Sequence, residues 1–200
     1  SGALRGMFEN PPDRAFALLP YVVAGVLASI GAEASSGRLP LMLTHPVTRS
    51  TYVLSHWAAS ATVAIGWALV GLLVEIAVLS AHGRGVYAPW AHAIDRAAWC
   101  AGLTAVLTCF STRLPSWGHL GLFLLLLYVI GISGESAGPV FKPVLNLAEE
   151  VLVPRFVVHG TFDTSPVTWS HLARYVALVS GWLLCAVLLF RNREVSYASR

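Results

Sequence analysis

Charged side chains are scarce in this chain, making up 12% of its 200 residues, whereas hydrophobic residues make up 56%. Soluble domains of this size carry about a quarter of charged residues, so the composition excludes an ordinary water-soluble fold. Apolar runs of roughly 20 residues, long enough to cross about 30 Å of hydrocarbon, recur along the sequence. We therefore predict an integral membrane protein.

Lysine and cysteine are also rare. The only lysine is Lys142, so the sequence has no Gly-x-x-x-x-Gly-Lys-Ser/Thr loop for the phosphates of ATP. The cysteines lie in apolar runs without Cys-x-x-Cys spacing, and we interpret them as small buried hydrophobic residues: Cys100, Cys109 and Cys185. The 13 basic residues are scattered along the chain, so no nucleic-acid-binding face is expected.

The hydrophobic pattern predicts an all-α, polytopic transmembrane helix bundle that forms a single domain over residues 1–200. Five spans are expected, at about 15–32, 52–81, 94–112, 117–133 and 172–190. The second run is longer than the hydrocarbon is thick, so it must tilt or protrude into water.

The region 134–170 is the expected outer loop between the last two spans. Within it, one helical face is apolar, formed by Val144, Leu147, Ala148 and Val151. We predict an extracytoplasmic interfacial helix there, with Glu149 and Glu150 facing water.

The distribution of arginine sets the expected orientation. If the segment 33–51 is cytosolic, the cytosolic segments hold six arginines in about 35 residues, whereas the opposite side spreads its basic residues over nearly twice that length. Four tryptophans lie near proposed span ends, as an aromatic belt would place them: Trp57, Trp90, Trp117 and Trp169. The C-terminus is then cytosolic. The excess of arginine over lysine favours a GC-rich bacterial genome, and hence a bacterial plasma (inner) membrane.

The segment 33–51 is the most informative polar stretch. Leu39, Met42 and Leu43 recur at helical spacing, with Arg38 and Arg49 as cationic edges, which predicts a short amphipathic helix at the membrane face. Such a helix suits either docking into a groove of a partner protein or lying on lipid headgroups as a connector.

The order of residues in and after this segment resembles the type-2 permeases of ATP-binding-cassette (ABC) exporters. The matching positions are Glu33, Gly37, Leu39, Leu41, Leu43, Pro46, Val47, Arg49, Tyr52 and Leu54, with Thr48 in place of the usual serine. The sequence departs from that pattern at residues 34–36, which are uncharged, at Pro40, and at Ser55 and His56, where the family commonly has Gly-Lys.

The resemblance implies a membrane-spanning permease subunit, not an enzyme, that forms a translocation path as a homodimer or related heterodimer. It also implies a coupling helix that docks on a separate ABC ATPase subunit, which would bind ATP and magnesium; no cofactor is expected in this chain. The residues implied in this coupling are Glu33, Gly37, Arg38, Leu39, Met42, Leu43, Pro46 and Arg49. Because the family has six spans, we expect a first span to precede Ser1.

Other polar residues leave alternatives open. Glu75 is an acidic residue well inside an apolar run, so it is a candidate for substrate gating, or a headgroup-level residue paired with Arg96 or Arg174. An intramembrane enzyme or a haem- or metal-binding membrane protein is the alternative function. Six of the histidines lie near the two membrane faces and are its candidate residues: His56, His82, His92, His119, His159 and His171. Ser133, between Gly131 and Gly134, is the corresponding candidate nucleophile. A scaffold for a larger membrane complex is a third possibility.

Overall fold

The structure, a computed structural model, consists of α-helices wherever it describes the chain, and it contains no strand in those ranges. The described residues are 48–83, 89–114, 118–136, 138, 141–154, 156 and 169–192. The helices are α5 (Arg49–Ala81), α6 (Pro89–Ser111), α7 (Gly118–Ser136), α8 (Lys142–Leu152) and α9 (Trp169–Arg191). The prediction of an all-α fold is confirmed for this part of the chain. The expected span at 15–32 lies outside it.

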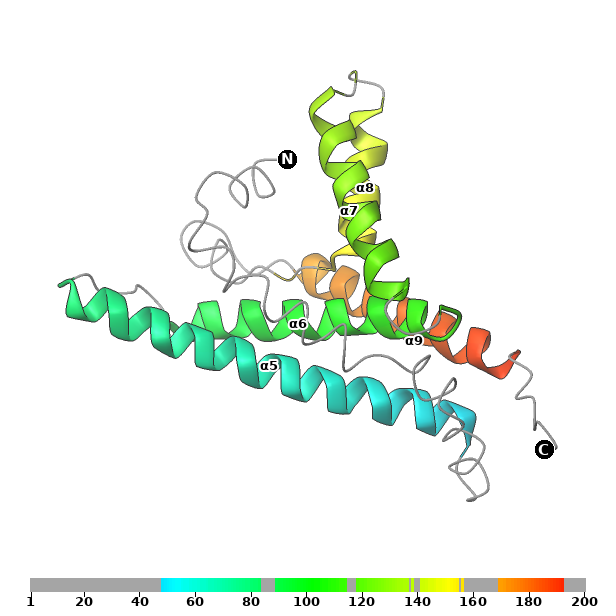
Figure 1. The fold of residues 1–200 in the computed structure, drawn as a ribbon, viewed down its shortest axis with the longest axis horizontal. Coiled ribbons are helices and arrows are strands. Elements are labelled where there is room, and N and C mark those ends of the chain that lie inside the picture. The colour runs from blue at the N-terminus through cyan, green and yellow to red at the C-terminus, as the bar shows by residue number, and fades with distance from the viewer. Residues whose placement is uncertain are drawn as a thin grey trace.

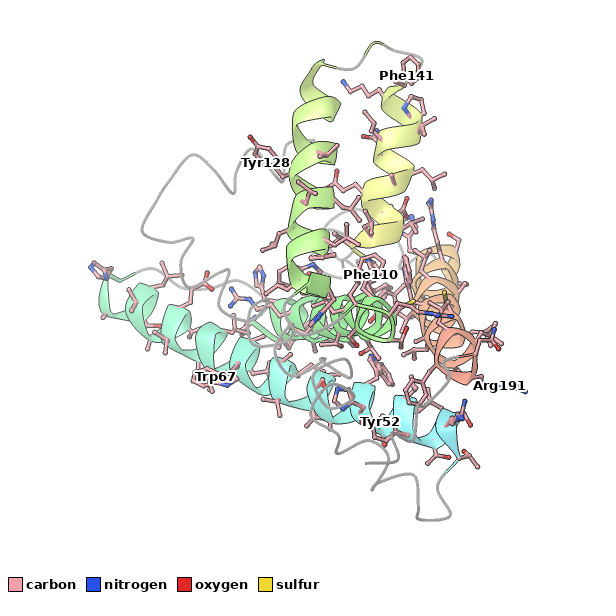
Figure 2. The ribbon with its side chains drawn as sticks, turned by 45° about the vertical axis from the view of Figure 1, so that its right-hand side comes forward. Tyr52, Trp67, Phe110, Tyr128, Phe141 and Arg191 are labelled. Carbon is pink, nitrogen blue, oxygen red and sulfur yellow. The ribbon has the colours of Figure 1, made fainter. Side chains whose placement is uncertain are left out.

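Three of the described helices, α5, α6 and α9, are long and apolar enough to cross a membrane. At 1.5 Å per residue the 33 residues of α5 extend about 50 Å, well beyond the roughly 30 Å of hydrocarbon. Many of its large apolar side chains face outward; Leu73 is 66% exposed. Figure 2 shows Trp67 on α5 and Tyr128 on α7 pointing away from the packed helices, as side chains that meet lipid would.

The first turn of α5 is fixed by a local cap. The Thr48 hydroxyl oxygen accepts a hydrogen bond from the Thr51 backbone N–H at 3.2 Å, which satisfies one of the amides that a helix start leaves without an intrahelical partner. The helix therefore begins at Arg49, inside the segment 33–51. Of that segment, the structure describes residues 48–51, which comprise the cap and the first residues of α5.

Helix α6 lies at the centre of the packing and contacts α5, α9 and α7. All eight residues from Gly102 to Cys109 are buried. On α5, the buried side includes small residues spaced three or four apart, Ala61, Ala64 and Ala68, and small side chains allow two membrane helices to approach closely. The hydroxyl of Thr104 donates to the Cys100 carbonyl at 2.8 Å, so this buried polar group is satisfied within its own helix.

Helices α7 and α8 form a hairpin that stands across the direction of α5, α6 and α9 (Figure 1). Leu120 and Phe123 bury the base of α7 in the core formed with α6, while its other described apolar residues are mostly exposed. This arrangement differs from the side-by-side bundle predicted for 117–133. Since α7 is apolar on nearly every side, its sequence does not select a packing face, and its crossing of a membrane stays a prediction.

Candidate functional site

Of the residues predicted to act in coupling or gating, the structure describes Arg49 and Glu75. The other predicted coupling residues lie outside the described part of the chain: Glu33, Gly37, Arg38, Leu39, Met42, Leu43 and Pro46. The geometry around Arg49 therefore shows where the end of the predicted coupling segment meets the membrane helices.

The guanidinium of Arg49 contacts the opposite end of the chain. Its Nη1 donates a hydrogen bond of 2.7 Å to the backbone carbonyl of Arg191, the last residue of α9. The last carbonyls of a helix have no intrahelical partner and carry partial negative charge. A cation in this position stabilises the helix end by about 0.3–1 kcal/mol. Arg49 thus caps α9 from the first residue of α5.

One turn further into α5, an aromatic contact joins the same two helices. The rings of Tyr52 and Phe190 stack with centroids 5.6 Å apart, and Phe190 is buried in a cluster with Val53, Cys109 and Ala186. Aromatic pairs in such arrangements contribute about 0.5–1.5 kcal/mol beyond their buried area.

We call Arg49, Tyr52, Phe190 and Arg191 the α5–α9 junction. It brings together residues 142 positions apart in the sequence, and Figure 2 shows Tyr52 and Arg191 at adjoining helix ends. The end of the predicted coupling segment and the end of α9 consequently lie at the same end of the helix layer. The first turn of α5 and the last turn of α9 are therefore in direct contact.

Glu75, the candidate gating residue, forms an ion pair with Arg96 of α6. Both side chains are partly exposed, 50% for Glu75 and 34% for Arg96. Glu75 lies 26 residues after Arg49, about 39 Å along the helix. The pair therefore lies towards the end of α5 that is far from Arg49, at a distance from Arg49 greater than the hydrocarbon thickness. The pairing that the sequence suggested with Arg96 is therefore present, whereas Arg174 pairs with Glu150 at 2.6 Å instead.

Polar contacts join the end of α8 to α9, and α9 in turn to α6. Trp182 Nε1 donates to the Val151 carbonyl at 2.8 Å, and the Tyr175 hydroxyl donates to the Ala98 carbonyl at 2.6 Å. The predicted helix with an apolar face is thus present as α8, and Val144 and Leu147 on that face are exposed. Its place at a membrane interface stays a prediction.

Residues that could bind a metal do not gather in the part of the chain that the structure describes. No group of three or more His, Cys, Asp or Glu side chains with suitable positions occurs there. Ser133 lies in α7. The alternative enzyme or haem-protein function stays a hypothesis from the sequence.

In the comparisons with known proteins, no family model, no curated protein and no solved structure matches this chain. The resemblance to type-2 permeases accordingly depends on the short sequence pattern alone.

Sequence reasoning identified Arg49 but missed its partners in α9. Phe190 was the last residue of an apolar run, and the Arg191 carbonyl belongs to the backbone, so neither carried a chemical signal. The one sequence signal for the contact between α5 and α9 was an aromatic residue near the start of α5, Tyr52, and another near the end of α9, Phe190.

Proposed function

We propose that this chain is the membrane-spanning permease subunit of an ATP-driven exporter of the ABC type-2 class. In this proposal two copies, or this chain and a related one, enclose the translocation path in a bacterial inner membrane. A separate ATPase subunit binds the cytosolic segment 33–49, and the C-terminus is also cytosolic. The chain itself hydrolyses no ATP, since its only lysine is Lys142, outside any phosphate-binding loop.

The observation that best supports this function is the α5–α9 junction. A coupling segment is useful only if force applied to it reaches the helices that line a path. The hydrogen bond from Arg49 to the Arg191 carbonyl and the stacking of Tyr52 on Phe190 link the end of that segment to α9 as well as to α5. One push on the segment would thus displace two membrane helices together.

The length of α5 extends this effect towards the opposite end. An α-helix is a stiff element, and α5 is continuous from Arg49 to Ala81. The Glu75–Arg96 ion pair joins its far part to α6. Tilting of α5 against α6 would separate these charges, so the pair is suited to hold the outer end closed until the ATPase moves the inner end.

Purification of the protein from its native membrane after mild chemical cross-linking tests the proposal. We expect a P-loop ATPase subunit in the cross-linked complex. Recovery of only a soluble redox protein or a protease would contradict the function. A cross-link from a cysteine introduced at Leu43, compared with one introduced at exposed Leu73 on α5, would then show whether the segment is the docking site.

A further inference from the structure

The end of α8 contacts α6 and α9 well away from the ends of those two helices. A Cβ on Gly102 of α6 would lie 2.8 Å from the Pro154 carbonyl oxygen, and Gly102 is nine residues before the last residue of α6. Trp182, whose Nε1 donates to the Val151 carbonyl at 2.8 Å, is likewise nine residues before the last residue of α9. Nine residues of α-helix extend about 14 Å.

The two distances are measured from the same end of the helix layer. Cys109 of α6 and Phe190 of α9 belong to one buried cluster, so both helices end near the α5–α9 junction. Each has 23 residues, which extend about 34 Å, and both are long and apolar enough to cross a membrane. The end of α8 is therefore at the middle depth of these helices.

Beyond α8 the chain turns towards the start of α9. The rings of Phe156 and Tyr175 have centroids 6.0 Å apart, and Tyr175 is seven residues nearer the start of α9 than Trp182, about 10 Å along the helix. Non-helical backbone within the membrane depth is tolerated only where protein covers it or where it lines a water-filled cavity. Val153 and Pro154 are buried, so protein covers this part of the backbone.

The last turn of α8 also carries a charged group to this level. Glu150, next to Val151, pairs with Arg174 of α9 at 2.6 Å, and the two side chains are 40% and 52% exposed. The described residues thus leave much of this ion pair uncovered. Contact of these charges with acyl chains would be strongly unfavourable, and ionisable groups at such depth face protein or a water-filled cavity.

We propose that the end of α8 forms the floor of a water-filled vestibule, which opens towards the start of α9 and has Glu150 and Arg174 in its wall. Its occupants are water and small hydrophilic solutes. In this arrangement α8 does not lie flat on the membrane surface, as an interfacial helix would, because its last turn is at the middle depth of α6 and α9. The inference does not depend on the proposed transport function, since it concerns the depth of one segment within one chain.

Thiol labelling of the full-length chain in lipid nanodiscs tests access of water. A positively charged methanethiosulfonate reacts with cysteines introduced as Glu150→Cys, Arg174→Cys and Val176→Cys, and peptide mapping separates each site from the native cysteines. Val176 is the matched control, because it is 51% exposed but lies two positions after Arg174, on nearly the opposite face of α9. We expect positions 150 and 174 to react at least about tenfold faster than position 176.

Depth is measured on bimane-labelled Glu150→Cys with lipids that carry a nitroxide on the headgroup. Trp169→Cys, at the exposed start of α9, gives the value for the membrane surface. We expect headgroup quenching at position 150 to be less than about half of that at position 169, since the label is deeper than the headgroups. If Glu150→Cys fails to insert, Arg174→Cys decides water access and Ala148→Cys, one turn from the end of α8, decides depth.

Two results would overturn the proposal. Equal labelling rates at positions 150, 174 and 176 would show that no water-filled vestibule reaches the ion pair. Headgroup quenching at position 150 as strong as at position 169 would show that α8 lies flat at the membrane surface.

Discussion

Replacement of Gly102 by alanine should destabilise the packing of α6 against the connector that follows α8. A Cβ at position 102 would lie 2.8 Å from the Pro154 carbonyl oxygen and 3.1 Å from the Pro154 Cβ. Both atoms belong to backbone or ring, so neither can swing aside as the end of a flexible side chain would. Overpacking of this kind costs about 1–3 kcal/mol.

The intrinsic effect of alanine acts in the opposite direction, since alanine is more favourable than glycine within a helix by about 1 kcal/mol. Gly181 of α9 provides the control, because a Cβ there meets nothing within 4 Å. The difference between Gly102→Ala and Gly181→Ala cancels the helix propensity and isolates the steric effect. We expect Gly102→Ala to be less stable than Gly181→Ala by about 1–3 kcal/mol.

Reversible unfolding in mixed detergent micelles, followed by circular dichroism, measures both variants under one condition. Gly66→Ala is a second control, on α5, where a Cβ also meets nothing within 4 Å. Equal stability of the variants at positions 102 and 181 would refute the close approach of Pro154 to α6. A loss at all three positions would show that alanine is unfavourable for reasons other than this contact.

Three further substitutions test individual contacts. Arg49→Gln removes the cation that caps α9, so we expect reduced substrate-stimulated ATP hydrolysis by the assembled complex, with Arg49→Lys restoring part of it. Unchanged substrate-stimulated ATP hydrolysis in both variants would show that this contact does not contribute to the proposed transport mechanism. Glu75→Gln should lower stability by at most about 1 kcal/mol, since the pair with Arg96 is partly exposed, and should raise ATP hydrolysis without substrate if the pair holds the outer end closed. Tyr175→Phe removes one hydrogen bond to the Ala98 carbonyl and should lower the free energy of unfolding by about 0.5–1.5 kcal/mol; an unchanged value would mean that lipid or water replaces this bond.

The helices were predictable because the signal for them is local. Runs of apolar residues near Tyr52–Ala81 and 172–190 are long enough to cross a membrane, and the structure has α5 and α9 there. The helix α8 could also be predicted, since its apolar residues recur every three or four positions. Helix starts were less certain: α6 begins at Pro89, before the expected start near 94, because proline is well accepted in a first helical turn.

The contacts between helices could not be predicted in the same way. Thr48, Arg49 and Tyr52 stand next to each other in a recognisable motif, but nothing in that motif specifies Phe190 or the Arg191 carbonyl as partners. Gly102 is one of 17 glycines in the sequence, and nothing in the sequence indicates that Pro154 lies against it.

The sequence by itself determined that lipid is the solvent for this chain, because burial of long apolar segments depends only on composition and length. It also determined where the polar segment 33–51 interrupts those runs, and with it the proposed function. The tertiary structure decided which helices meet through which residues: Arg49 with the end of α9, and Glu75 with Arg96 of α6. Inside a membrane, apolar surface alone does not select one partner helix over another. Pairing therefore depends on a few close-packed and polar contacts whose members are distant in the chain.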